Sequence, residues 1–495
     1  MHRRNKYSQQ IEFEELARVY PPLLDHLKPA HPPSRRKTID FQDADAQRLF
    51  YTAISDCTSR CPTIGYVHQC RIGPPIFSGS IQCVAELFGR LNYVLWIQDI
   101  MRAHRFLFRE DVRTVRGIDI GTGASAIYPL LACKMEPAWD FIATEIDSKS
   151  FNCGESNIQD NNLGERIRLM RASSDKPILF PFENYSGPPF DFTMCNPPFY
   201  TSRAEIARST EFKELPPSGV CTGADTEMIY PPGGEAAFVG QMVDESERHG
   251  AKCRWFTTMI GKMSTMSEII VMLRKRSIRT YAITEFVQGQ TRRWGIAWSF
   301  TNEHLPDSFG RLSVHPNNAL HSLQPPRNTL TSQFQLSFTS IDAQYLQTSL
   351  LGICSLARVA ASERPIILEE EDFPKASSFP TFRLNPVLVQ AHANTWSRRA
   401  RRNLDQPQPG EREGSITPQT SVTLMCSMQW LFDFSEVPAR VVLESQWVFG
   451  DDRQMFEGLV AHIVKKLTQA LETYTPRAPE IDSGSEATLA SPIAH

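Results

Sequence analysis

Between residues 115 and 301, short apolar runs alternate with segments of helical periodicity, and this alternation restricts the fold more than any other feature of the chain. Strands separated by helices are typical of a parallel sheet with right-handed crossovers and helices on both faces. The last two strand-like runs follow each other without a helix, so we expect an antiparallel hairpin from 281 to 301. The sequence therefore predicts an α/β, Rossmann-like fold with the strands VRGIDIG, DFIATEID, RIRLMRA, FDFTMC, AKCRWFTTMIG, RTYAITEFVQG and RRWGIAWSFT.

The segments on either side of this core have a different texture. The first 110 residues combine a basic start with helical patterns that Pro21-Pro22 and Pro74-Pro75 interrupt. Beyond 328, a strand and a helix are separated from two further strands and a helix by charged, Pro-containing sequence. We expect an N-terminal basic arm and helical extension at 1–110, an α/β core at 111–303, a linker at 304–328, a smaller split α+β domain at 329–475 with a disordered loop at about 363–420, and a disordered tail at 476–495.

The composition excludes several classes of protein. The 495 residues are 41% hydrophobic and 22% charged, which rules out collagen-like and wholly disordered chains. No run approaches the roughly 18 apolar residues that a membrane-spanning helix needs, and we expect a soluble intracellular protein. The formal net charge of -3 still allows local basic patches. The 11 cysteines fit reduced thiols, and no metal is expected because the spacing of Cys57, Cys61, His68 and Cys70 does not match a structural zinc site.

A glycine turn follows the first strand of the core. Asp119 lies near the strand end, and Gly121 and Gly123 allow the backbone of GIDIGTGAS to approach a ligand at the N-terminus of the next helix. Glu145, at the end of the second strand, can accept hydrogen bonds from two ribose hydroxyls. Because dinucleotide enzymes share this geometry, the turn alone leaves a nicotinamide cofactor and S-adenosylmethionine as alternatives.

The fourth strand ends in a motif that decides between these alternatives. Asn196-Pro197-Pro198-Phe199 follows FDFTMC directly, at the same edge of the sheet as the glycine turn. The exocyclic amine of a base is a poor nucleophile because its lone pair is delocalised into the ring. If Asn196 Oδ1 and the Pro197 carbonyl accept its two N–H groups, the lone pair points at a methyl donor, while Phe199 stacks on the base. The motif predicts methyl transfer from S-adenosylmethionine to an amine, with Pro198 keeping the turn rigid and no covalent role for Cys195.

Basic residues near the start of the chain and at the expected hairpin form a candidate nucleic-acid site. Guanidinium and ammonium groups hold phosphates, and such binding weakens as the salt concentration rises. The expected patch consists of Arg3, Arg4, Lys6, Arg292 and Arg293, extended by Lys252, Arg254 and Lys262.

The combination of these motifs resembles the eukaryotic methyltransferase-like family that installs N6-methyladenosine on U6 small nuclear RNA. That family is related to bacterial enzymes that modify an adenine of large-subunit ribosomal RNA. The resemblance runs from residue 1 to about 301 and implies a class I methyltransferase fold with S-adenosylmethionine as cofactor. The matching segments are MHRRNKY, RLNYVLWIQD, RGIDIGTGASAIYPLL, ATEID, FDFTMCNPPF, the GGE of PPGGEAAFV, RWFTTMIGK and TEFVQGQTRRWGIAWSF.

The resemblance also implies particular contacts. A loop that gates the cofactor and the target base maps to SSDKPIL, where Lys176 would contact RNA and the Pro177 backbone would lie beside the cofactor. In vertebrate members a C-terminal α+β region is thought to bind RNA, and the pattern at 420–474 is similar to it; a protein-interaction module is the alternative. The residues implied to contact the cofactor are Arg90, Gly121, Ser125, Glu145 and Asn196, with Arg90 pairing with the cofactor carboxylate.

We therefore predict an RNA N6-adenosine methyltransferase that acts on a structured RNA such as U6 small nuclear RNA. We expect a monomer in the nucleus, with the cytoplasm as a second location and no membrane partner. The RRARR run at 398–402 is a candidate nuclear localisation signal, a further RNA contact or a solvated loop. The alternatives are methylation of an rRNA adenine or guanine, a DNA adenine or a protein glutamine, and a non-catalytic RNA-binding role.

Overall fold

The computed structural model divides into two compact units, one containing residues up to Asn328 and the other beginning at Thr329. Each unit has its own hydrophobic core. The predictions for Arg3, Lys6, the Cys57–Cys70 group and the tail from 476 lie outside the described residues. The structure describes residues 2, 4–5, 13–29, 37–39, 43, 45–46, 49, 82–108, 113–183, 185–206, 228–288, 291–312, 318–334, 343–364, 381–398, 400, 402, 421–433 and 440–474.

The first unit is built on a seven-stranded sheet with the order β5-β4-β3-β6-β7-β9-β8. The strands from β5 to β7 are parallel, and their order is that of a doubly wound sheet. The last two strands form the expected antiparallel hairpin, and β9 pairs with β7. The predicted Rossmann-like fold is confirmed by the strands β3 (Val115–Ile120), β4 (Trp139–Glu145), β5 (Ile167–Arg171), β6 (Phe190–Cys195), β7 (Cys253–Ile260), β8 (Thr280–Gln288) and β9 (Thr291–Ser299).

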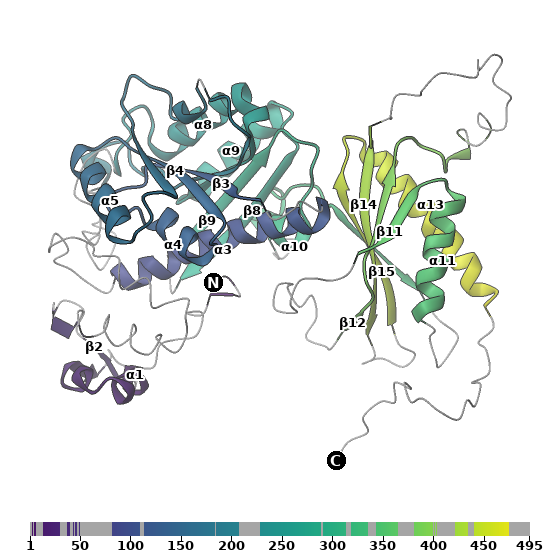
Figure 1. Cartoon of the computed structure of the whole chain (residues 1–495), viewed down its shortest axis with the longest axis horizontal. Coiled ribbons are helices and arrows are strands. Elements are labelled where there is room, and N and C mark those ends of the chain that lie inside the picture. The colour runs from purple at the N-terminus through teal and green to yellow at the C-terminus, as the bar shows by residue number, and fades with distance from the viewer. Residues whose placement is uncertain are drawn as a thin grey trace. The chain divides into compact units, whose positions relative to one another are not determined.

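Helices cover both faces of this sheet (Figure 1). Side chains of α3, α4 and α5 enter one apolar cluster, and side chains of α8 and α9 enter a second one with Phe190 and Phe256 of the sheet. Helix α8 has no counterpart among the expected elements, because the small residues of GGEAAFVGQ weaken the helical signal. The helices are α3 (Gln82–Phe108), α4 (Ile127–Met135), α5 (Ser148–Asp160), α8 (Gly234–His249), α9 (Met263–Lys275) and the short α10 (Asp307–Gly310).

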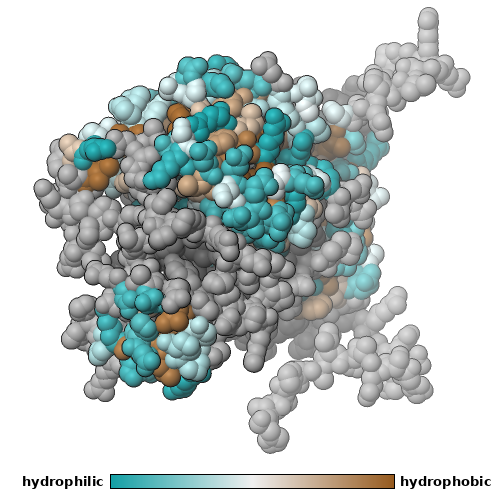
Figure 2. Space-filling view, turned by 60° about the vertical axis from the view of Figure 1, so that its left-hand side comes forward, coloured by the Kyte–Doolittle hydropathy of each residue, from teal (hydrophilic) through white to brown (hydrophobic). Residues whose placement is uncertain are grey.

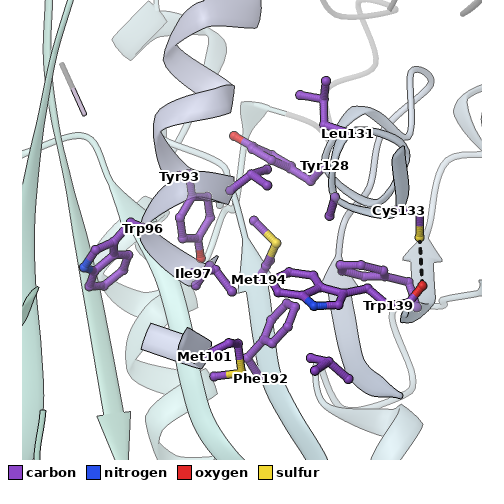
Figure 3. Packing of buried hydrophobic residues seen from close by; sticks show 14 of the residues in the cluster. Tyr93, Trp96, Ile97, Met101, Tyr128, Leu131, Cys133, Trp139, Phe192 and Met194 are labelled. Atoms are coloured by element: carbon purple, nitrogen blue, oxygen red, sulfur yellow. Dashed lines mark hydrogen bonds between the residues drawn. The ribbon is translucent and has the colours of Figure 1, made fainter. Parts of the chain in front are cut away.

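Aromatic side chains dominate the first of these clusters (Figure 3). Trp139 of β4 packs against Phe192 of β6 with ring centroids 5.1 Å apart, and Tyr93 of α3 meets the edge of Tyr128 of α4 at 5.6 Å. Residues 92–101 of α3 are all buried. The polar residues of that stretch are covered by the N-terminal segment, where the backbone N–H of His2 donates to Asn92 Oδ1 at 2.9 Å.

Residues 304–328, which the sequence suggests as a linker, contribute to the first unit. Leu305 is part of the first cluster, and the carbonyl of Phe309 accepts a hydrogen bond from Trp96 Nε1 at 3.1 Å. The hydroxyl of Tyr281 donates to the Leu323 carbonyl at 3.2 Å. The linker prediction is wrong because these few apolar side chains are dispersed in Pro- and Asn-containing sequence and form no periodic pattern.

Several short elements complete the first unit. A two-stranded antiparallel sheet pairs Leu27–Pro29 with Lys37–Ile39. These elements are α1 (Phe13–Val19), η2 (Pro21–His26), β1 (Leu27–Pro29), β2 (Lys37–Ile39), η4 (Phe180–Phe182), η5 (Gly250–Lys252) and η6 (Ala319–His321).

The second unit is a six-stranded antiparallel sheet with two helices on one face (Figure 1). The path through the sheet is β10-β15-β14-β13-β11, and β12 pairs with β14. Leu346 and Leu350 of α11 share one buried cluster with Phe456 and Leu459 of α13. The elements are β10 (Thr329–Phe334), α11 (Ala343–Leu356), β11 (Ala360–Glu363), β12 (Thr381–Arg383), β13 (Val387–Ala391), β14 (Leu424–Asp433), β15 (Arg440–Phe449) and α13 (Arg453–Glu472).

The prediction of a disordered loop at about 363–420 is wrong for part of that range. Strand β13 lies between β11 and β14, and Val387 and Val389 are completely buried in the cluster beneath the helices. The run VLVQA is only five residues long, and the charged and Pro-rich sequence on both sides dominates the local composition. Residues 365–380 and 403–420 lie outside the described part of the chain.

The described surface in Figure 2 is mainly hydrophilic, and its apolar residues form small separate groups. Among the described helices, none combines the length and the apolarity that crossing a membrane requires.

Candidate active site

Three of the parallel strands, β3, β4 and β6, end beside one another at the carboxyl edge of the sheet, and most of the predicted catalytic and cofactor residues lie at or just after their ends. After β3 the chain turns through Gly121, Gly123 and Ala126 with positive φ angles of 67°, 70° and 46°. A β-carbon at either glycine would meet no heavy atom within 4 Å. Close packing is therefore not the reason for these glycines. They provide the left-handed backbone and leave open space beside the turn.

Glu145 ends β4 and is 3% exposed. Its Oε2 accepts a hydrogen bond from the backbone N–H of Gly123 at 2.8 Å, and its Oε1 accepts from the backbone N–H groups of Ile146 and Asp147 at 2.8 Å each. The carboxylate predicted to bind a ribose thus also ties the glycine turn to the end of β4. Its place directly beside the turn agrees with the predicted cofactor arrangement.

Asp119 lies beside the glycine turn, and the sequence pattern indicated its environment only weakly. Its side chain is buried, and among the described residues neither carboxylate oxygen makes a hydrogen bond of good geometry, although the Thr122 hydroxyl lies near it. Burial raises the pKa of Asp119 to about 7, the neighbouring Thr122 side chain lowers it, the nearby Glu145 raises it, and Arg90 of α3 lowers it. The only available signal was an acidic residue next to a glycine turn. A buried carboxylate without well-formed hydrogen bonds is suited to a cationic group of a ligand.

Arg90 and Ser125 lie close to this turn. Arg90 is half-buried, with its guanidinium carbon 5.8 Å from the centre of the Tyr128 ring. Ser125 is half-buried within the turn that leads into α4. The structure thus brings the predicted cofactor residues of α3, β3 and β4 to one edge.

Asn196 directly follows β6, and the pairing of Ile120 with Cys195 puts it level with Gly121 across the adjacent strand ends. Its Oδ1 atom is buried and has no hydrogen-bond partner in the described structure. Leaving a buried amide oxygen unpaired costs free energy, so such an atom calls for a ligand that donates a hydrogen bond. Pro197 and Pro198 are buried and hold the turn.

Two residues lie close to the ring of Phe199. A β-carbon at Gly261 would come within 2.7 Å of the ring, and the Arg293 guanidinium lies 5.3 Å from the ring centre. The Gly261 loop is held by Glu235 of α8, whose carboxylate accepts the backbone N–H groups of Gly261 at 2.5 Å and Lys262 at 3.2 Å. Glu235 belongs to the GGE motif noted in the sequence. Its role in holding the Gly261 loop beside the Phe199 ring was not predicted.

The basic residues do not form one patch. Arg254 is the second residue of β7 and pairs with Asp191 at 3.4 Å, whereas Lys262 follows the end of β7 and pairs with Glu205 at 2.7 Å. Lys252 is also at the start of β7, where it donates to the Phe182 carbonyl. Lys252 and Arg254 therefore lie at the edge of the sheet opposite to the site, and the prediction that they extend the patch is wrong.

The remaining residues predicted to contact RNA differ in their exposure and in their partners. Arg292 is exposed and pairs with Glu285 at 3.0 Å, and Lys176 is exposed, with its Nζ 5.2 Å from the centre of the Phe180 ring. Pro177, next to it, is half-buried. Arg4 faces α3 instead of solvent and pairs with Asp99 at 2.5 Å.

No group of three or more potential metal ligands occurs among the residues with described coordinates.

Comparisons with known proteins identify relatives of this chain. A family model described as RNA methyltransferase matches residues 1–302. The U6 small nuclear RNA (adenine-(43)-N(6))-methyltransferase of Schizosaccharomyces pombe is 30% identical over 380 residues, which cover 76% of this chain and 85% of the relative. The mouse RNA N(6)-adenosine-methyltransferase METTL16 is 32% identical over 334 residues, 67% of this chain and 56% of the relative.

Among solved structures, the N-terminal domain of human METTL16 in complex with SAH is 30% identical, covers 61% of this chain and 98% of that structure, and has a TM-score of 0.44. The chain spans just over half the length of the mouse relative. The match of the family model to more than half of the chain confirms the resemblance seen in the motifs, and the chain belongs to the RNA methyltransferase family that includes METTL16 and the U6 small nuclear RNA adenine-N6 methyltransferases.

Proposed function

We propose that this chain transfers a methyl group from S-adenosylmethionine to the N6 amine of an adenine in a structured RNA, with U6 small nuclear RNA as the substrate to test first. The single observation that carries the proposal is the buried, unpaired Oδ1 of Asn196 beside the glycine turn. An adenine N6 amine supplies the hydrogen-bond donor that this oxygen lacks. The names of the two curated relatives support RNA adenine as the substrate class.

The residues at the strand ends fit the cofactor. When bound, S-adenosylmethionine supplies a sulfonium methyl group, the electrophile of a one-step displacement. Glu145 would hold the ribose hydroxyls, and the unpaired carboxylate of Asp119 would attract the positive amino group. The open space beside Gly121 and Gly123 allows a ligand to approach the backbone. The proposed cofactor residues are Arg90, Gly121, Gly123, Ser125, Glu145, Pro177 and Asn196, with Asp119 added.

The catalytic contribution of the chain is positioning. Asn196 Oδ1 and the Pro197 carbonyl would each accept one N–H of the target amine, so that its lone pair leaves the plane of the base. Pro198 keeps the turn rigid, and Phe199 stacks on the base. The proton released after transfer passes to solvent, so no nucleophilic side chain is needed. Burial raises the pKa of the adjacent Cys195 far above its usual range, and that thiol remains protonated.

RNA would be held beside this turn by basic side chains. Arg293 lies against Phe199 and would contact the phosphates next to a stacked base. The proposed RNA residues also include Arg3, Lys6, Lys176 and Arg292. For Arg4, whose guanidinium is engaged by Asp99, we propose a role in holding the N-terminal segment on α3.

The identity of the methylated nucleoside tests the proposed function. Purified protein would be incubated with methyl-labelled S-adenosylmethionine and a U6 small nuclear RNA transcript, and the RNA digested to nucleosides and separated. We expect the label in N6-methyladenosine, and none when DNA of the same sequence replaces the RNA. Label in guanosine or in protein would contradict the proposal.

We also infer that the protein acts in the nucleus, since the fission yeast relative is named for a small nuclear RNA. The RRARR run at 398–402 is the candidate import signal. A fluorescently tagged full chain should be nuclear, and replacement of the four arginines by alanine should shift it to the cytoplasm. A nuclear signal that is unchanged by the replacement would exclude this run as the import signal.

A further inference from the structure

The last residues of β6 are held differently on their two sides. Towards β3, paired residues continue as far as Ile120 and Cys195. Towards β7, pairing is limited to Phe190 with Cys253 and Phe192 with Trp255. Side-chain hydrogen bonds replace the ladder beyond that point, and they hold the part of the strand that leads into Asn196.

The hydrogen bonds at this position form a directed chain. Thr257 Oγ1 donates its only hydrogen to the Thr193 carbonyl at 2.6 Å. The bond of 2.6 Å between Thr257 Oγ1 and the Tyr93 hydroxyl must therefore be donated by Tyr93. The Tyr93 oxygen in turn accepts the backbone N–H of Cys195 at 3.3 Å. Tyr93 thus joins β7 to the residue immediately before Asn196.

Tyr93 is fixed by its surroundings. It is completely buried, and its ring packs against Trp96, Tyr128 and Phe286 with centroid distances of 6.2, 5.6 and 5.9 Å. Figure 3 shows the ring in the core between α3 and the strand of Met194. Burial raises the pKa of Tyr93 well above its usual range, so the hydroxyl stays neutral and keeps its hydrogen.

We propose that Tyr93 is a positioning residue for methyl transfer, whose hydroxyl sets the place of the Asn196-Pro197 turn by holding the N–H of Cys195 against β7. The proposal rests on the proposed function, since it assigns a task to the same site. Packing alone requires only the aromatic ring, which phenylalanine also supplies. The hydroxyl is needed because the backbone ladder with β7 has ended where the catalytic turn begins.

The test is Tyr93→Phe in the full chain, with kcat measured at saturating RNA and cofactor. We expect kcat to fall by about 10- to 100-fold, because a small displacement of a positioning group is enough to cause such a loss. The dissociation constant for S-adenosylhomocysteine and the KM for RNA should stay within about twofold of the unaltered protein. A kcat within twofold, or a loss confined to KM or cofactor binding, would overturn the proposal.

Tyr281→Phe is the matched control. Tyr281 is also buried, but its hydroxyl bonds to Arg274 and to the Leu323 carbonyl, near the start of β8 and away from the turn. This variant should lower the melting temperature about as much as Tyr93→Phe while keeping kcat. An equal loss of kcat in both variants would show that Tyr93 acts only through general stability.

Thr257 gives a second test that holds even if Tyr93→Phe does not fold. Thr257→Val removes the acceptor of the Tyr93 hydroxyl and should lower kcat by a similar factor, whereas Thr257→Ser keeps the acceptor and should restore it. Equal rates in the two variants would refute the proposed chain. The ratio of variant to unaltered rate can be measured whichever nucleoside is methylated, so failure of the proposed substrate and failure of this proposal are distinguishable.

Discussion

Two buried oxygen acceptors lie at the same edge of the sheet, and the structure treats them in opposite ways. Glu145 at the end of β4 accepts three backbone N–H groups, and Asn196 at the end of β6 leaves its Oδ1 without a partner among the described residues. The first acceptor contributes to the local structure before any ligand arrives. The second is the acceptor that we propose for an N–H of the target amine. Substitution of Glu145 should therefore lower stability and cofactor affinity, whereas substitution of Asn196 should lower the rate of methyl transfer.

The largest effect is expected for Asn196→Ala. Removing the acceptor for the target amine should lower kcat by about 10³-fold, comparable with the loss of one preorganised hydrogen-bonding group in other active sites. Because Oδ1 has no structural partner, the melting temperature should change little, and cofactor affinity should stay within about threefold. Single-turnover kinetics and calorimetric titration measure these quantities. Substantial remaining activity would remove the proposed mechanism.

Gly261→Ala should disturb the Phe199 ring, which is proposed to stack on the base, without disturbing the proposed cofactor residues. The added β-carbon would come within 2.7 Å of the Phe199 ring and must displace it. We expect kcat/KM for RNA to fall by roughly 10- to 100-fold with cofactor affinity unchanged. Gly352→Ala is the matched control, because its β-carbon on α11 would meet no atom within 4 Å. Equal activity of both variants would show that the position of the Phe199 ring does not matter for methyl transfer.

Glu145→Gln should affect the acceptor that is already hydrogen-bonded within the folded chain. The amide loses one of the acceptors that bind the turn and places an N–H₂ group against backbone donors. We expect cofactor affinity to fall about tenfold or more and the free energy of unfolding to drop by about 1–3 kcal/mol. Titration with S-adenosylhomocysteine and denaturant unfolding measure both effects. A variant that loses activity while keeping cofactor affinity and stability would contradict the structural role.

The effect of Asp119→Asn on the stability of the cofactor-free protein should depend on pH. The folded state raises the pKa of Asp119 from 3.8 to about 7 and thus holds the proton more tightly than the unfolded chain. The penalty for the aspartate is absent below about pH 4, grows as the pH rises to about 7, and reaches at most about 4 kcal/mol. The asparagine variant should therefore unfold at a higher temperature than the unaltered protein at pH 8 and at a similar temperature at pH 4. No difference at pH 8 would contradict the buried, unpaired carboxylate.

Local patterns predicted the α/β core because its strands are apolar runs between helices, with a hairpin where no helix intervenes. The same approach failed for Val387–Ala391, where a five-residue strand lies within charged sequence, and for 304–328, where the apolar residues are dispersed. It also grouped Arg254 with Lys262, although the length of β7 separates them. The edge of the sheet at which a side chain lies depends on where its strand begins and ends. The composition of a segment carries no information on these strand bounds.

For the site, the sequence by itself determined the chemistry. An asparagine before two prolines and an aromatic residue, after a strand that follows a glycine turn, already predicts methyl transfer to an amine. Only the tertiary structure decided how each group is used. Whether an oxygen is satisfied, as in Glu145, or unpaired, as in Asn196 and Asp119, depends on contacts between segments distant in the chain. The link from Thr257 through Tyr93 to Cys195, which precedes the Asn196 turn, spans three elements, and no local pattern contains it.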